Sequence, residues 1–318
     1  MKEPRPPSDA SEQCELRTPF LSPIYSVPIE RTRFDTTLRA KNFLLTYMAL
    51  EESVLQVLYA EQLFEEFLLR GALDFYLFTT HDYQYFQQMR LRANIHVGGV
   101  LNAITSFRDQ FPKFADHPEA NATRKIAQSR WAELKSESVT FVFGERLRNY
   151  AQHQNQPVSS ATTGGGWDEG RTLLESHLSV FCDVGAVADN RDIEQEERER
   201  YLQAFGESAD LSLVIREMVG KVGIIVKETR DHLAAAYEAA ISQYEDTLSL
   251  ASPYFDGSKT TDMVRLAEGA QERHRLFEEF TQQAKLLRSN MVMTNNHMHF
   301  ISNRARGHLA TANASRKT

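Results

Sequence analysis

The placement of proline constrains the fold of this chain more than any other feature of its sequence. Ten prolines occur in 318 residues, and none of them lies between Pro28 and Pro112. Proline fixes its own φ angle and has no amide hydrogen, so it interrupts helices and favours extended or turn structure. The proline-rich residues 1–34 therefore predict an extended or disordered arm. The proline-free stretch that follows is rich in Leu, Phe, Tyr, Glu and Gln, and it predicts helix.

Apolar residues in the proline-free stretch recur at three- and four-residue intervals, which is typical of a helix with one buried face. The clearest series consists of Tyr47, Leu50, Val54, Val57 and Leu58. Gly71 is a candidate C-cap for this helix. A second helix is predicted over about residues 81–110, where Pro112 would stop it.

A third helix is predicted from Asn121, a suitable N-cap, to His153, since Pro157 prevents further extension. In the second half of the chain, apolar periodicity predicts a helix over about 215–248 and another from Thr261 to at least Leu286. Helical segments therefore account for most of the predicted structure.

The best internal boundary is the polar, glycine-rich segment 156–170, which predicts a flexible loop. It separates a helical domain over residues 35–155 from a C-terminal helical region over 171–318. Residues 175–187 fit either a short strand or a buried helix. The expected fold is therefore all-α, a multi-helix bundle with two helical halves and at most one short β element near 175–187.

Composition excludes several classes of protein. Hydrophobic residues make up 42% and charged residues 25% of the chain, which is ordinary for a globular protein and excludes disorder as a whole-chain description. The net charge of -7 argues against a protein that coats nucleic acid non-specifically. No uncharged apolar run approaches the ~20 residues that span a bilayer. We expect a soluble, cytoplasmic protein without a membrane partner.

Neither cysteines nor histidines predict a metal site. Cys14 and Cys182 lie too far apart in sequence for a disulfide scaffold or a zinc module, and we expect reduced thiols, with Cys14 exposed. His297 and His299 are two residues apart, so on a helix their imidazoles would point in nearly opposite directions. We expect no metal and no cofactor.

The segment that carries chemistry is Arg148-Asn149-Tyr150-Ala151-Gln152-His153, at the end of the third predicted helix. Arg148 and His153 are about 140° apart around a helix axis, on either side of Asn149, so both can edge one cleft. A histidine can remove the proton of a ribose 2′-hydroxyl near neutral pH. An arginine can stabilise the charge that develops on a phosphodiester. Asn149 would hold the imidazole in one tautomer.

This Arg-Asn-x-x-x-His segment resembles the signature motif of the HEPN superfamily. The resemblance covers about ten residues and the run of helices before them. It implies an α-helical homodimer in which two copies of the motif face one cleft, and a metal-independent endoribonuclease that leaves 2′,3′-cyclic phosphate ends. It also implies an RNA substrate and a toxin or antiviral defence role, with an antitoxin or other regulatory partner.

The resemblance implies that Arg148 and His153 are catalytic and that Asn149 supports them. Glu145, about one helical turn before Arg148, is a weaker candidate for orienting that arginine. The remaining candidates for supporting residues are Arg146, Tyr150 and Gln152.

Local charge favours an RNA substrate, because six Lys and Arg residues stand against three Glu residues over 122–154. The same sequence also fits an ordinary helix C-terminus, where the helix dipole favours Arg146, Arg148 and His153. The alternative function is therefore a non-catalytic helical interaction or regulatory protein that binds a partner or a nucleotide with this face.

Overall fold

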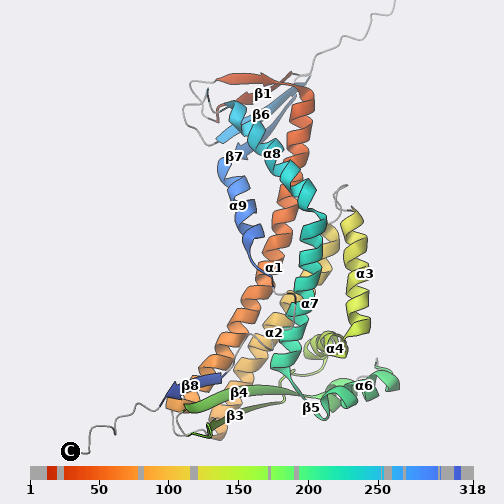
Figure 1. Cartoon of the computed structure of the whole chain (residues 1–318). Helices are drawn as coiled ribbons and strands as arrows, with labels where there is room; N and C mark the ends of the chain where they lie inside the picture. The colour runs from red at the N-terminus through yellow and green to blue at the C-terminus, as the bar shows by residue number, and fades with distance from the viewer. Residues whose placement is uncertain are drawn as a thin grey trace, which may run out of the picture. The chain divides into compact units, whose positions relative to one another are not determined.

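The chain folds into helices and two β-sheets that form two compact units (Figure 1). The computed structural model describes residues 13–19, 25–77, 82–114, 121–170, 173–189, 193–251, 253, 260–267, 270–292, 294 and 304–308. Unit 1 consists of residues 1–52, 114–121 and 230–291, and unit 2 of residues 53–113, 122–229 and 292–318. Each unit is therefore assembled from segments that lie far apart in the sequence.

Unit 1 is built on an antiparallel sheet with the strand order β2-β1-β6-β7. Its strands are β1 (Gln13–Arg17), β2 (Ser26–Ile29), β6 (Thr260–Ala267) and β7 (Ala270–Phe277). The helices of this unit are α1 (Arg31–Leu77) as far as Glu52, α8 (Ala234–Ala251) and α9 (Glu278–Ser289).

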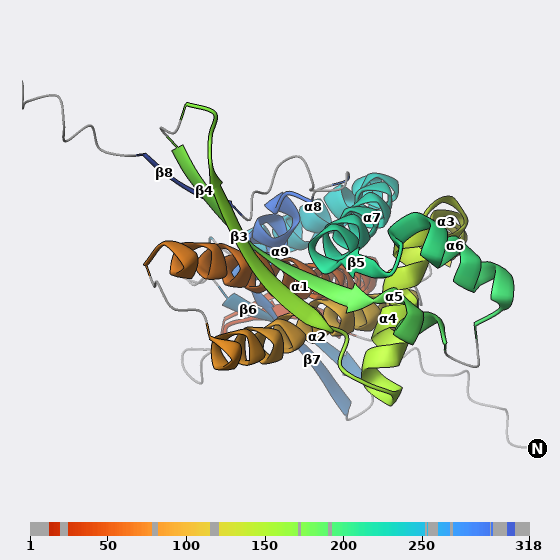
Figure 2. The same ribbon diagram turned by 90° about the horizontal axis from the view of Figure 1, so that it is seen from below.

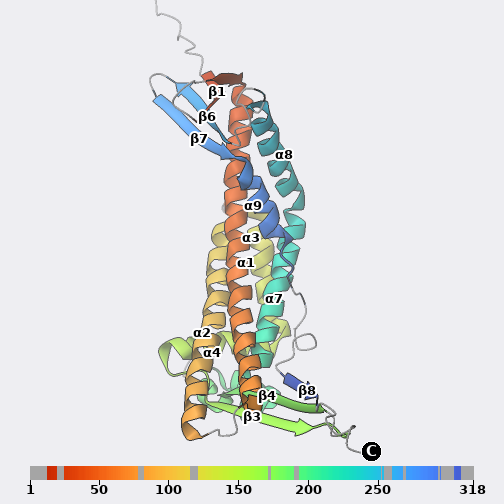
Figure 3. The ribbon, with the colours of Figure 1, turned by 90° about the vertical axis from the view of Figure 1, so that its left-hand side faces the viewer.

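Helices α8 and α9 lie beside the first part of α1 (Figure 3). Side chains from these distant segments join the three helices. Thr37 of α1 and Thr247 of α8 share a buried hydrogen bond of 2.8 Å. Arg288 of α9 donates to the Tyr47 hydroxyl at 2.7 Å. Its guanidinium lies 4.5 Å from the centre of the Tyr237 ring, a cation–π contact.

Unit 2 contains the second antiparallel sheet, in which β4 lies between β3 on one side and β5 and β8 on the other (Figure 2). The strands are β3 (Ser160–Trp167), β4 (Leu173–Asp183), β5 (Ser208–Asp210) and β8 (Arg304–His308). The helices are the rest of α1, α2 (Tyr83–Phe114), α3 (Asn121–Glu137), α4 (Val139–His153), α5 (Val184–Ala188), α6 (Gln195–Phe205) and α7 (Leu211–His232) as far as Thr229.

The end of α1 packs directly against β4. A Cβ atom at Gly71 would overlap the Leu178 side chain, so the helix approaches the strand this closely because residue 71 is glycine. Ser176 of β4 donates to the Ala72 carbonyl oxygen at 2.7 Å. Gly71 therefore lies inside α1 as a packing residue, and the prediction that it caps the helix is wrong.

The all-α prediction is wrong, since the described residues form two antiparallel sheets as well as helices. The largest error is the helix predicted from Thr261, because residues 260–267 and 270–277 form the paired strands β6 and β7 and the helix is limited to α9. The C-terminal region is therefore mixed, and the segment around 175–187 is strand β4 to Asp183 and helix α5 after it.

Two segments predicted to lack regular structure are also strands. Within the predicted arm, residues 13–17 and 26–29 form β1 and β2, and Cys14 is buried in β1 with 4% exposure rather than exposed. The predicted loop 156–170 contains β3. The two compact units also interleave along the chain, whereas the predicted domains follow one another at the glycine-rich segment.

Ser138 divides the third predicted helix into α3 and α4. Its side-chain oxygen accepts a 3.1 Å hydrogen bond from the Phe141 amide, which makes it the N-cap of α4, and its hydroxyl donates to Glu217 of α7. The other predicted helix boundaries differ less. Asn121 does begin α3, and α2 continues two residues beyond Pro112 to Phe114.

Replacing Ser138 with Ala is expected to destabilise unit 2 by about 1–2 kcal/mol, because the first turn of α4 loses its cap. Urea unfolding followed by circular dichroism measures the effect. Ser136→Ala is the matched control, since Ser136 is exposed and its one hydrogen bond among the described residues goes to the Glu133 carbonyl oxygen. Its loss should be within about 0.5 kcal/mol. Equal unfolding midpoints for the two variants would contradict a capping role.

Candidate functional site at the end of helix α4

Helix α4 carries all the residues of the Arg-Asn-x-x-x-His motif. One face of the helix is buried, and its buried residues are Phe141, Phe143, Gly144, Leu147 and Tyr150. A Cβ atom at Gly144 would overlap the sulfur of Met218, so α4 approaches α7 closely at this point. The buried face fixes the direction in which the remaining side chains point.

The structure brings Arg148 and Asn149 together but does not join either of them to His153. Arg148 Nη1 donates to Asn149 Oδ1 at 3.3 Å, and Arg148 Nε is buried without a hydrogen-bond partner among the described residues. Asn149 and His153 are exposed, and His153 is the last residue of the helix. The Asn149 side-chain oxygen therefore faces Arg148 rather than the imidazole that it was expected to hold.

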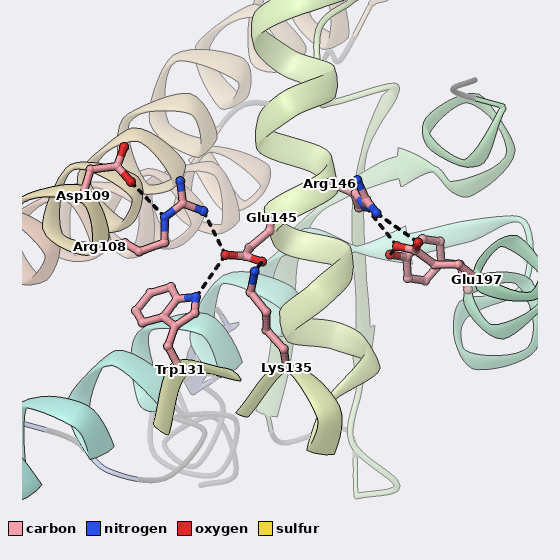
Figure 4. Close-up of polar contacts among 8 residues, drawn as sticks. Arg108, Asp109, Trp131, Lys135, Glu145, Arg146 and Glu197 are labelled. Atoms are coloured by element: carbon pink, nitrogen blue, oxygen red, sulfur yellow. Dashed lines mark hydrogen bonds and ion pairs between the residues drawn. The ribbon is translucent and has the colours of Figure 1, made fainter. Parts of the chain in front are cut away.

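Glu145 does not orient Arg148. Its carboxylate is the meeting point of three donors from other parts of unit 2 (Figure 4). Arg108 of α2 lies 3.0 Å from Oε1, Trp131 of α3 donates to the same oxygen at 3.1 Å, and Lys135 of α3 lies 2.6 Å from Oε2. Glu145 thus links α4 to α2 and α3, which is a structural role.

Arg146 also has a partner of its own. Its guanidinium donates to both carboxylate oxygens of Glu197 on α6, at 2.9 and 3.0 Å, and the Tyr201 hydroxyl donates to the same carboxylate. Burial alone would raise the pKa of Glu197, but the hydrogen bonds from Arg146 and Tyr201 lower it below its ordinary value. Arg146 therefore holds α6 against α4.

The two remaining candidates have structural contacts. Tyr150 is 8% exposed and belongs to the core, and burial raises the pKa of its hydroxyl. Gln152 is exposed and donates to Asn102 of α2 at 3.2 Å. Both residues help to fix the last turn of α4, next to His153.

A cavity of about 650 Å³ lies along one side of α4, a feature that the sequence did not reveal. Residues of α2, α3, α4 and α6 line it, together with Glu194, which precedes α6. The lining residues with polar side chains are Arg108, Lys135, Ser136, Glu145, Arg146, Asn149, Glu194, Glu196, Glu197, Arg200 and Tyr201. Asn149 lines this cavity, whereas Arg148 and His153 do not. The only sequence signal was the three- and four-residue spacing of Val139, Val142, Glu145, Arg146 and Asn149.

No cluster of three or more His, Cys, Asp or Glu side chains suited to a metal ion occurs in the described part of the chain. His297 and His299 lie outside the described residues. The two cysteines are buried, and burial raises the pKa of the Cys182 thiol to about 12. Among the described helices, none is long and apolar enough to cross a membrane.

Comparison with known proteins gives no family for this chain. No family model, no curated protein and no solved structure matches it.

Proposed function

We propose that the chain is a cytoplasmic, metal-independent endoribonuclease of the HEPN type, with Arg148 and His153 as its catalytic residues. The observation that carries the proposal is the contrast between Arg148 and its neighbours. Arg108 and Arg146 are each held by carboxylates, whereas Arg148 has no ion pair among the described residues. A guanidinium without a carboxylate partner, about 1.4 helical turns from an exposed histidine, is available to a phosphate.

The reaction proposed is attack of a ribose 2′-oxygen on the adjacent phosphorus. His153 takes the 2′-hydroxyl proton as the 2′-oxygen forms its bond to phosphorus. The bond from phosphorus to the 5′-oxygen breaks, and that oxygen leaves with a proton from solvent or from a second imidazole. Arg148 stabilises the extra negative charge on the phosphoryl oxygens. The products are a 2′,3′-cyclic phosphate and a 5′-hydroxyl.

The proposed active site is formed by two copies of the chain. Within one helix, Arg148 and His153 are separated by about 140° around the axis and roughly 7.5 Å along it. A cleft bordered by the α4 ends of two copies would offer a guanidinium from one side and an imidazole from the other. Asn149, hydrogen-bonded to Arg148, would hold that guanidinium in place.

The test is cleavage of total RNA and of tRNA in EDTA by the wild type and by His153→Ala and Arg148→Ala. Loss of a general base costs about 10²–10⁴-fold in rate, and loss of the charge-stabilising group about 10²–10³-fold. Wild-type products should carry cyclic phosphate ends. Circular dichroism should show both variants folded, since His153 is exposed and Arg148 makes a single described hydrogen bond.

His232→Ala and Arg92→Ala are the matched controls, because both side chains are exposed and neither belongs to the motif; His232 likewise ends a helix. They should cleave RNA at the wild-type rate. If wild type, controls and motif variants all behave alike while folded, the nuclease proposal is rejected, and the end of α4 is better explained as a binding surface.

A further inference from the structure

Strand β3 is an edge of the unit 2 sheet that lacks the usual protection against pairing. Its only strand partner among the described residues is β4. Residues 160–167 contain no charged residue and no proline. In unit 1, by contrast, edge strand β2 contains Pro28, and edge strand β7 contains Glu272, Arg273 and Arg275. Proline and charge are the devices that keep an edge strand unpaired, so β3 is suited to accept another strand.

The hydrogen-bonding groups at this edge follow from the pairing with β4. The Asp168 amide donates at 2.9 Å to the carbonyl oxygen of Leu173, which continues the β3–β4 register. In an antiparallel pair the residues alternate between bonding the partner strand and facing away from it. Counting back from Asp168, the backbone groups that face the outer edge belong to Ala161, Thr163, Gly165 and Trp167.

The two faces of β3 are also distinct. A Cβ atom at Gly165 would lie 2.8 Å from the ring of Phe75 on α1, so the odd-numbered residues of the strand face the helices. The even-numbered residues face the other way. Thr162 and Gly166 are exposed, and a Cβ atom at Gly166 would meet nothing within 4 Å.

The two ends of β3 have complementary surroundings. At its start, the Val158 amide donates to Asn94 Oδ1 of α2 at 2.8 Å, which places the exposed α2 residues Leu91 and Ile95 nearby. Leu91 is 49% and Ile95 74% exposed, although both are apolar. The other end carries exposed Trp167, followed by the acidic Asp168 and Glu169.

We propose that β3 pairs with β3 of a second copy of this chain, antiparallel and with a two-fold axis at Gly164. Thr163 then lies opposite Gly165 of the second copy, and Ala161 opposite Trp167 of the second copy. In this register, the outward-facing N–H and C=O groups of each β3 lie opposite those of the other copy. No like charges are opposed, because Asp168 of one copy faces Ser160 of the other.

Exposed apolar surface favours a second copy over an unrelated strand. Antiparallel pairing brings the end of each β3 to the start of the other. It also brings Trp167, on the helix side of the sheet, toward Leu91 and Ile95 of the second copy. A two-fold interface requires a surface that is complementary to itself, and the two ends of β3 meet this requirement.

This interface does not rest on the proposed nuclease activity. The two Ser160 residues of the pair would be roughly 27 Å apart at ~3.4 Å per residue, so the contact is separate from a cleft shared by two α4 ends. A failed nuclease assay therefore leaves the interface untouched, and a failed pairing test leaves the nuclease untouched.

The test is a disulfide between copies in the full chain carrying Thr162→Cys and Gly166→Cys. In the proposed register, residue 162 of one copy lies opposite residue 166 of the other, on the exposed face. Such a non-hydrogen-bonded pair has Cα atoms about 4.5 Å apart, within the range that a disulfide spans. The native Cys14 and Cys182 are buried and should contribute little background. Mild oxidation should convert most of the protein into a covalent dimer on a non-reducing gel.

Ser160→Cys with Gly166→Cys is the register control, since these positions would not face each other and should give at most a small fraction of dimer. Thr163→Pro removes an outward N–H but none that β4 uses, and sedimentation equilibrium should show that it weakens self-association at least tenfold. The proposal is overturned if the first pair links no better than the register control, or if Thr163→Pro associates as the wild type does. It is also overturned if the wild type shows no self-association at 100 μM, since a dissociation constant of about 100 μM is taken as the weakest useful affinity.

Discussion

Replacing Glu65 with Ala is expected to lower the free energy of unfolding of unit 2 by about 3–5 kcal/mol. Glu65 lies on α1 and binds Arg216 of α7 through two hydrogen bonds, both 2.7 Å long. The side chain of Arg216 is only 4% exposed. The substitution leaves a guanidinium buried without its counter-charge, and that penalty exceeds the modest net value of the pair itself. Urea unfolding at neutral pH, followed by circular dichroism, measures the loss.

Glu66→Ala is the matched control, because Glu66 is the next residue of the same helix and accepts a single hydrogen bond from Gln62, at 2.7 Å. Its loss should be within about 0.5 kcal/mol. The double variant Glu65→Leu with Arg216→Met should recover most of the lost stability, since it removes both charges and keeps the volume apolar. If Glu65→Ala unfolds at the same urea concentration as Glu66→Ala, the pair does not hold α1 to α7.

Buried pairs of this kind explain why the helices were easier to predict than their arrangement. The apolar spacing that predicts α1 depends on residues a few positions apart, and Leu50, Val54 and Val57 are indeed buried in it. The partner of Glu65 is 151 positions away, and nothing near Glu65 in the sequence identifies it. Local periodicity therefore gave the helices, whereas the units and their interleaved segments depend on distant contacts.

The strands were missed for two physical reasons. In β6, Thr261, Asp262, Met263 and Val264 are all buried, so the strand lacks the alternation of buried and exposed residues that identifies a half-buried strand. Asp262 tolerates burial because Arg273 and Arg275 of β7 bind its carboxylate. Burial alone would raise the pKa of Asp262, but these hydrogen bonds lower it. A charged residue at this core position interrupts the apolar run by which a buried strand is recognised in a sequence.

The glycines of β3 led to the wrong prediction of a loop for a different reason. Three consecutive glycines are typical of a loop, because glycine costs more conformational entropy to order than any other residue. In the folded chain, side chains from elsewhere occupy the space beside two of them: His177 next to Gly164 and Phe75 next to Gly165. These neighbours exclude a larger residue, which the sequence of the segment alone does not indicate.

For the candidate site, the sequence identified the chemistry of the side chains but not their partners. It predicted that Glu145 orients Arg148, since the two are three residues apart on one helix. The carboxylate instead binds Arg108 and Lys135, from two other helices. The charges around α4 are therefore mostly balanced within unit 2, and the +3 of residues 122–154 overstates the cationic surface that an RNA would meet.

Replacing Phe143 with Ala is expected to cost about 3–5 kcal/mol, comparable with the loss at Glu65. Phe143 is fully buried on α4, with its ring centre 5.2 Å from that of Tyr201 and 4.8 Å from that of Phe205, both on α6. Truncation removes this aromatic contact and leaves a cavity that the surrounding helices fill only in part. Urea unfolding measures the loss, and Phe143→Leu should show a smaller one because it keeps most of the volume.

Leu202→Ala is the matched control on α6, because Leu202 is 37% exposed and its truncation should cost well under 1 kcal/mol. The Phe143 variant also separates the structural role of α4 from its proposed catalytic role. Phe143 lies on the buried face, whereas His153 is exposed at the end of the helix, so the folded fraction of Phe143→Ala should cleave RNA within a few-fold of the wild-type rate. Equal stability of the Phe143 and Leu202 variants would show that α6 is not held to α4 by this contact, and that the Arg146–Glu197 pair is its main attachment.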